Sequence, residues 1–147
     1  MHTACMTDID RRGFLSMCAL SVAALGVTSL VTPTAAEAAT GIKRLPNGKV
    51  QVTVRKFAAL ATVGKAVKIG NVKGVPVAVV RTGRTTFIAL NLRCTHEGVT
   101  VTPTATGFTC PAHGSKFGKN GARTRGPAST ALRRLPVTLS RGVLTVG

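Results

Sequence analysis

The chain has 147 residues, among them 16 Gly and 7 Pro but no Trp or Tyr. This length allows one compact domain, and apolar residues that are mostly Val, Ala and Leu favour short strands over long helices. The formal net charge of +16 suits acidic partners or anionic surfaces. The cations are scattered singly and do not interleave with aromatic residues, which argues against nucleic acid as the partner.

The N-terminal segment has the features of an export signal. Residues 10–16 (DRRGFLS) resemble a twin-arginine signal, in which one variable residue and then Phe-Leu follow Arg-Arg. An apolar stretch covers residues 17–31, and residues 36–38 offer an A-x-A cleavage site. Because the apolar stretch is shorter than the roughly 20 residues that span a bilayer, we expect residues 1–38 to be a removable signal peptide. A retained membrane anchor is the alternative.

Removal of this segment would change both the charge and the cysteine content. It would leave 18 Lys and Arg, the chain's 20 less the twin arginines, against Glu97 as the one acid. It would also leave two cysteines, Cys94 and Cys110. Two cysteines in an exported domain first suggest a disulfide. The competing interpretation, metal ligation, depends on the histidines that accompany them.

The rest of the chain reads as a series of short strands. Residues 39–48 are expected to be a linker, with a Pro-Asn-Gly turn signal at its end. Val then alternates with polar residues, the period of a half-buried strand, and the helical pattern is limited to one turn over residues 57–61. The strand predicted from this alternation is Lys49–Arg55. Further strand-like runs, separated by Gly-containing turns, are Ala66–Ile69, Val75–Val80, Thr85–Leu90, Leu135–Leu139 and Val143–Val146. An all-β domain over residues 49–147 follows.

A small ligand-binding subdomain is predicted at about residues 91–131, where Gly and Thr replace the Val runs. Cys94 and His96 form a C-x-H motif there, and Cys110 and His113 form C-x-x-H, with 13 residues between the two motifs. Zinc accepts two Cys and two His as tetrahedral ligands. A Rieske centre places both thiolates on one iron and both imidazoles on the other. The four side chains by themselves fit both kinds of site.

The residues around these motifs resemble the Rieske family. Residues 94–98 (CTHEG) and 110–117 (CPAHGSKF) are similar to the two Rieske boxes, and residues 126–128 (GPA) to the proline loop that covers the cluster. Residues 131–146 are similar to the closing strands. The resemblance implies a Rieske-type antiparallel β sandwich with an inserted cluster-binding subdomain, one [2Fe–2S] cluster per chain and no catalytic site of its own. The ligands that it implies are Cys94, His96, Cys110 and His113.

Some positions depart from high-potential members of the family. Val99 and Ala112 stand where many of these carry a disulfide that braces the two loops. Ser115 matches the serine that donates to a bridging sulfide and raises the potential, whereas Phe117 stands where a Tyr would supply a second donor. Glu97 occupies a position that is often apolar in quinol-oxidising relatives. We therefore expect an unbraced cluster of intermediate potential.

The resemblance and the signal together indicate an exported electron-transfer protein or the small iron–sulfur subunit of an oxidoreductase, either quinol:cytochrome c reductase-like or arsenite-oxidase-like. Its partner would be an acidic redox protein or a larger oxidoreductase subunit. The expected location is the periplasm or the outer face of the cytoplasmic membrane, with membrane association through the partner or through an uncleaved N-terminus. The alternatives are a Rieske-type ferredoxin that feeds an oxygenase and a zinc-stabilised binding domain.

Overall fold

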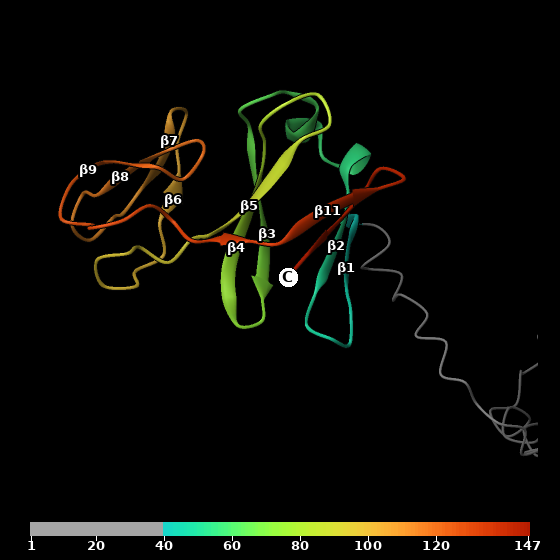
Figure 1. Ribbon diagram of the computed structural model, residues 1–147, viewed down its shortest axis with the longest axis horizontal. Coiled ribbons are helices and arrows are strands. Elements are labelled where there is room, and N and C mark those ends of the chain that lie inside the picture. Colours follow the sequence, from blue (N-terminus) through green and yellow to red (C-terminus); the bar gives the residue numbers. More distant parts are fainter. Residues whose placement is uncertain (1–39) are drawn as a thin grey trace, which may run out of the picture. The chain divides into compact units, whose positions relative to one another are not determined.

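The computed structural model describes residues 40–147, which form three antiparallel four-stranded sheets (Figure 1). The predicted signal peptide lies outside the described residues. Within the described part, no helix is long and apolar enough to cross a membrane. The all-β class predicted from the sequence is confirmed.

The first two sheets form a sandwich. The first has the order β1 (Ile42–Arg44), β2 (Val50–Thr53), β12 (Val143–Val146) and β11 (Val137–Ser140). The second has the order β10 (Arg134–Leu135), β5 (Phe87–Asn91), β4 (Val75–Arg81) and β3 (Ala66–Val72). Two short 3-10 helices, η1 (Val54–Lys56) and η2 (Ala58–Ala61), connect β2 to β3, so the predicted helical turn is also confirmed.

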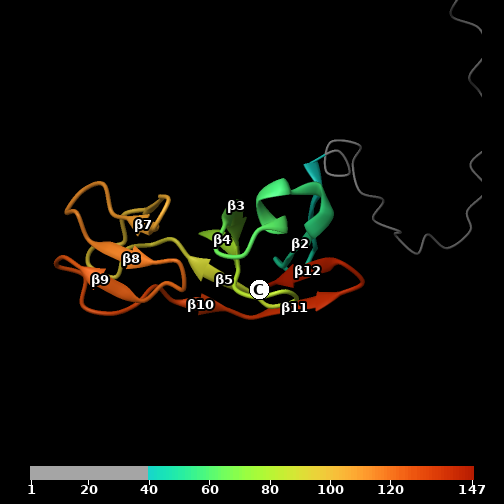
Figure 2. The same ribbon diagram turned by 90° about the horizontal axis from the view of Figure 1, so that it is seen from above.

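The third sheet holds the region in which the ligand motifs occur. Its order is β6 (Thr102–Pro103), β7 (Gly107–Thr109), β8 (Lys116–Gly118) and β9 (Arg123–Arg125). It is built from the chain between β5 and β10, and Figure 2 shows it at the end of the domain beyond these two strands. The sheet corresponds to the insertion expected at about residues 91–131.

Two hydrophobic cores lie on opposite faces of the second sheet, because side chains alternate between the faces of a strand. In β4, Val77 and Val79 belong to the core of the sandwich, whereas Ala78 and Val80 belong to the core beneath the third sheet. All four are at most 1% exposed. The second core also contains Leu90, Leu92, Cys94, Val101, Phe108, Cys110, Phe117, Ala128 and Leu132. The third sheet is thus fixed to the sandwich by apolar packing.

The sandwich differs from the sequence prediction at three main places. The strand predicted over Lys49–Arg55 ends at Thr53, because the next residues form η1. Residues 39–48 were expected to be a linker, but Ile42–Arg44 forms β1, which pairs with β2 as a hairpin. The single strand expected over Leu135–Leu139 is divided at Pro136, since β10 pairs with β5 and β11 pairs with β12. Proline cannot donate to a strand ladder, and the chain passes between the two sheets at this residue.

Candidate metal centre

The first ligand loop is a tight turn that begins at Cys94. The Cys94 N–H donates to the Val99 carbonyl at 2.8 Å, and the Gly98 N–H donates to the Cys94 carbonyl at 2.8 Å. Gly98 has φ 73°, a left-handed conformation that favours glycine. The turn places the Cys94 side chain inward, at 3% exposure, while His96 lies on the outside of the loop.

The second ligand loop repeats this backbone pattern. The Cys110 N–H donates to the Ser115 carbonyl at 2.8 Å, and the Gly114 N–H donates to the Cys110 carbonyl at 3.0 Å. Gly114 also has a positive φ, of 69°. In both loops the glycine comes four residues after the cysteine. The sequence contains this equal spacing from cysteine to glycine. It did not by itself indicate that the two loops share a backbone conformation, because the spacing from cysteine to histidine differs between them.

The two thiols lie side by side in the core beneath the third sheet. Cys94 and Cys110 are both buried and form no disulfide. Burial raises the pKa of the Cys110 thiol, but hydrogen bonds from the backbone N–H groups of His113 and Ala112 and from the Cys94 thiol outweigh that effect. The nearby charge of Glu97 also raises it, and the net result is a pKa below the ordinary value. The fold therefore makes the Cys110 thiol easier to deprotonate than an ordinary cysteine, and the thiolate is the form that binds metal.

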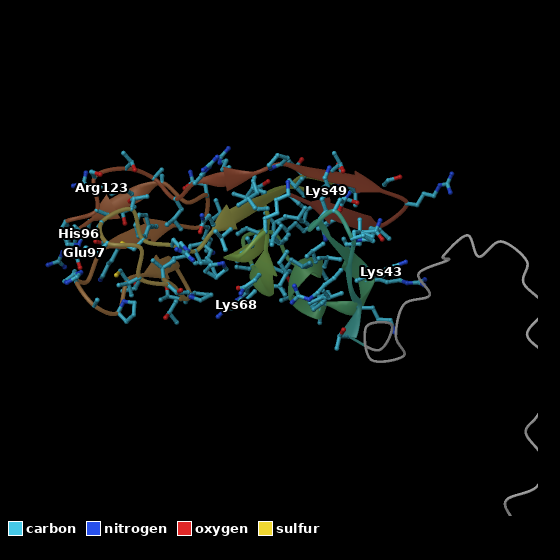
Figure 3. All side chains as sticks on the ribbon, turned by 90° about the horizontal axis from the view of Figure 1, so that it is seen from below. Lys43, Lys49, Lys68, His96, Glu97 and Arg123 are labelled. Atoms are coloured by element: carbon cyan, nitrogen blue, oxygen red, sulfur yellow. The ribbon has the colours of Figure 1, made fainter. Side chains whose placement is uncertain are left out.

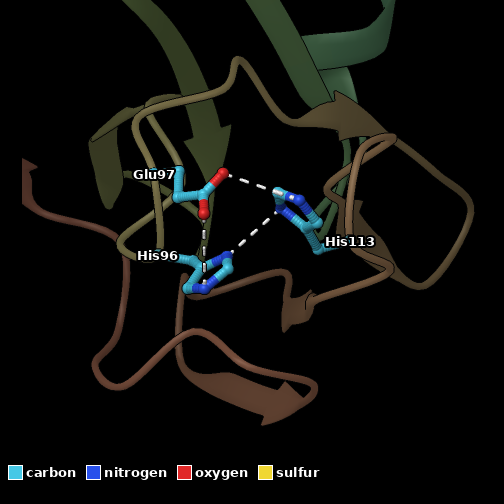
Figure 4. Close-up of side chains that lie close together, drawn as sticks. All are labelled: His96, Glu97 and His113. Carbon is cyan, nitrogen blue, oxygen red and sulfur yellow. Dashed lines mark hydrogen bonds and ion pairs between the residues drawn. The ribbon is translucent and has the colours of Figure 1, made fainter.

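The two imidazoles converge at the rim of the same site (Figure 4). The Nδ1 atoms of His96 and His113 are 3.2 Å apart, with ring centroids 4.7 Å apart and ring planes at 87°. Glu97 lies on the other side of the rings, with a carboxylate oxygen 3.9 Å from Nε2 of His96 and another 3.5 Å from Nε2 of His113. The three side chains are 31%, 38% and 57% exposed in the order His96, His113, Glu97. Both histidines thus turn Nδ1 toward one point and Nε2 toward the carboxylate.

A third segment, residues 126–130, closes over both loops. The Ala128 N–H donates to the hydroxyl of Ser115 at 3.1 Å, and Ser115 is fully buried. The hydroxyl of Thr95 in the first loop donates to the Thr130 carbonyl at 2.7 Å. Gly126 has φ 96°, and a Cβ on it would lie 2.5 Å from Cα of Ser115. The sequence indicated Ser115 and this loop, but it gave no sign of the contact that Thr95 makes.

The donor set has two unlike ends. Two sulfurs lie at the buried base, and two imidazole nitrogens converge at the exposed rim. Soft thiolates and imidazoles suit zinc or iron–sulfur chemistry, and a [2Fe–2S] centre with sulfur ligands on one iron and nitrogen ligands on the other fits this division. The structure therefore brings together the four side chains that the sequence singled out. Phe117 packs in the core at 2% exposure.

Comparison with known families gives one clear match. A model described as the Rieske [2Fe-2S] domain matches residues 51–136, which is more than half of the chain. The matched span includes both ligand loops and the closing segment.

Similar proteins carry related descriptions. The cytochrome b6-f complex iron-sulfur subunit 1 of Nostoc sp. is 31% identical over 137 residues, which cover 85% of this chain and 76% of that protein. The carotenoid phi-ring synthase of Chlorobaculum tepidum is 40% identical over 76 residues, 50% of this chain but only 12% of that longer protein. The crystal structure of a plasma membrane Rieske protein from Synechocystis superposes with a TM-score of 0.49 at 27% identity, over 69% of this chain and 87% of that one.

Proposed function

Because the chain belongs to the Rieske [2Fe–2S] domain family, we propose that it is an exported electron-transfer protein that works as the iron–sulfur subunit of a quinol-oxidising complex. Membership of the family implies one [2Fe–2S] cluster, which takes up and releases a single electron when it is bound. The zinc-stabilised binding domain is left without support. The ligands that we propose are Cys94, His96, Cys110 and His113.

The unequal exposure of the two ends of the site carries this proposal. The sulfurs of Cys94 and Cys110 are buried, whereas the imidazoles of His96 and His113 are about one third exposed. A redox partner can therefore approach the histidine end but not the cysteine end. The outward Nε2 atoms can hydrogen-bond to a partner or a substrate there. Similarity to the iron–sulfur subunit of a cytochrome b6-f complex supports a quinol-oxidising partner.

Genetic removal of the protein tests this function. Membranes of the producing cells should lose quinol-dependent cytochrome reduction when the gene is deleted, and the wild-type gene should restore it. Restoration by a His113→Ala variant would contradict the proposal, because this substitution removes one proposed ligand. Unchanged activity in the deletion strain would also contradict it.

Export by the twin-arginine route is a separate part of the proposal. The DRRGFLS motif supports it, since that route accepts folded proteins that already contain their cofactor. Replacing Arg11 and Arg12 by Lys should keep the holoprotein in the cytoplasm, whereas replacing Arg133 and Arg134 by Lys should not. The iron content of each cell fraction measures this. Equal export of both variants would contradict the proposed route.

The second candidate function is a Rieske ferredoxin that supplies electrons to an oxygenase. The observation that favours it is that no disulfide can link the two ligand loops, because Val99 and Ala112 stand where that disulfide would require cysteines. This function predicts a holoprotein that stays in the cytoplasm and accepts electrons from a pyridine-nucleotide-dependent reductase. Cell fractionation therefore separates the two candidates.

A further inference from the structure

Strands β8 and β9 carry a concentration of positive charge next to the metal centre. Lys116, Arg123 and Arg125 are all exposed, and we call these three residues the basic strip. Lys116 and Arg125 are directly opposite each other in the register of the two strands, and β9 is the edge strand of its sheet. Side chains that are directly opposite on neighbouring antiparallel strands share a face. Lys116 and Arg125 therefore place two like charges on one face, beside a register irregularity between Lys116 and Phe117.

Within the described residues, the basic strip has no compensating carboxylate. Glu97 is the one acidic side chain of residues 40–147, and its ion pairs are with His96 and His113. In the same part of the chain, the only side-chain hydrogen bond of the strip joins Arg123 to the Gly126 carbonyl, at 3.5 Å. Like charges directly opposite each other destabilise a sheet. A single cation already protects an edge strand against pairing with other chains, so the opposed pair is not explained by the needs of the fold.

The basic strip directly adjoins the metal centre along the chain. Lys116 directly follows Ser115, the last residue of the second ligand loop, and Arg125 directly precedes Gly126, where the closing segment begins. Figure 3 shows Arg123 at the same end of the domain as His96 and Glu97, whereas Lys43 and Lys68 lie away from it. A protein that binds the strip would therefore lie beside the exposed histidines.

We propose that the basic strip is the docking surface for an acidic electron-carrier protein. The inference rests on the proposed electron-transfer function and adds the surface and the charge of the partner to it. A negatively charged patch on the partner would relieve the repulsion between Lys116 and Arg125, and opposite charges on the two proteins would accelerate their encounter. In the reaction, one electron passes from the reduced holoprotein to the oxidised carrier, so no further reactant is needed.

Binding to a defined probe tests the surface. We would measure the affinity of the oxidised holoprotein for an acidic c-type cytochrome by calorimetry at several salt concentrations. The double variant K116Q/R125Q should bind about tenfold more weakly at low salt, and the difference should disappear at high salt, where charges are screened. A basic c-type cytochrome should bind weakly to all forms.

The matched control is K43Q/K68Q, which removes the same charge from the sandwich. It should change the affinity much less than K116Q/R125Q does. An equal loss in the two variants would overturn the proposal, since the attraction would then be a property of the net charge and not of the strip. Thermal unfolding gives an independent readout, because K116Q/R125Q should be at least as stable as the wild type. A clear loss of stability together with unchanged binding would show that the strip serves the fold.

Electron-transfer kinetics separate this inference from the proposed function. The reduced holoprotein should reduce the acidic cytochrome in a stopped-flow experiment, more slowly in K116Q/R125Q at low salt and equally fast at high salt. Transfer that is insensitive to K116Q/R125Q would overturn the docking surface alone. No transfer to either cytochrome, from a holoprotein that gives a reversible voltammetric wave, would overturn the proposed function together with the surface.

Discussion

Glu97 is the carboxylate that contacts both outward histidine nitrogens, at 3.9 Å from His96 and 3.5 Å from His113. A negative charge at this place disfavours the addition of an electron to the nearby centre. We expect Glu97→Gln, which keeps the shape of the side chain, to raise the reduction potential. Protein-film voltammetry measures it, and an unchanged or lower midpoint would contradict the assignment.

Ser115 is the second residue that we expect to affect the reduction potential. Its buried hydroxyl accepts from the Ala128 N–H, so its own proton is available to donate toward the metal centre. Ser115→Ala should lower the midpoint potential because this donor stabilises the reduced form. The variant should also lose about 1–3 kcal/mol of stability, since the Ala128 N–H loses its acceptor. A loss of stability with an unchanged midpoint would show that the hydroxyl serves packing alone.

The side chains that lie at the candidate site could be predicted from the sequence, whereas their role as cluster ligands stays a prediction. The two motifs, together with the Gly-Ser and Gly-Pro-Ala segments, indicated the side chains that the structure brings together. The position of Glu97 across both imidazoles could not be predicted, because it depends on how two loops meet. The same is true of the hydrogen bond from Thr95 to Thr130, which joins segments 35 residues apart.

At the scale of the element, alternation of Val with polar residues was sufficient to find β2, and short apolar runs bounded by Gly-containing turns were sufficient to find β4 and β12. These patterns missed β6 to β9, which have two or three residues each and are too short to show a period. They also missed β1, whose three residues are soon followed by the Pro-Asn-Gly turn signal at residues 46–48. These strands depend on partners distant in the chain or on tight turns, and local sequence carries little information about either.

The closing segment depends on Gly126, which has both a positive φ and no room for a side chain. Gly126→Ala should displace the segment from Ser115 and shorten the lifetime of the cluster in air, followed by the decay of its visible absorption. Gly74→Ala is the control, because Gly74 has φ 79° and a Cβ added to it would meet nothing within 4 Å. It should cost only the backbone strain, about 1–2 kcal/mol. Equal cluster lifetimes in the two variants would contradict the role of the close contact.

At the scale of the whole molecule, the second sheet divides the apolar side chains between two cores. Val79 faces the sandwich and Val80 faces the core that contains both cysteines, and each is at most 1% exposed. Val79→Ala and Val80→Ala should each cost roughly 2 kcal/mol of stability. Only Val80→Ala should also accelerate cluster loss. Iron release during thermal unfolding distinguishes the two variants. Identical release from both would show that the two cores stabilise the cluster equally.

The charge distribution also belongs to the whole molecule. Lys and Arg are spread over all three sheets, while the one acidic side chain of the described residues lies at the rim of the metal centre. The general positive field attracts acidic proteins to any face. The basic strip then supplies the local preference that orients the histidine end toward the partner.

The central claim is that two cysteines and two histidines of this chain hold the cluster, and electron paramagnetic resonance of the reduced holoprotein tests it most directly. We predict an average g value well below that of four-cysteine clusters, together with hyperfine couplings from two histidine nitrogens. His96→Ala and His113→Ala should each abolish this signal. A four-cysteine type of signal without nitrogen coupling, or a colourless protein with one zinc per chain, would contradict the account.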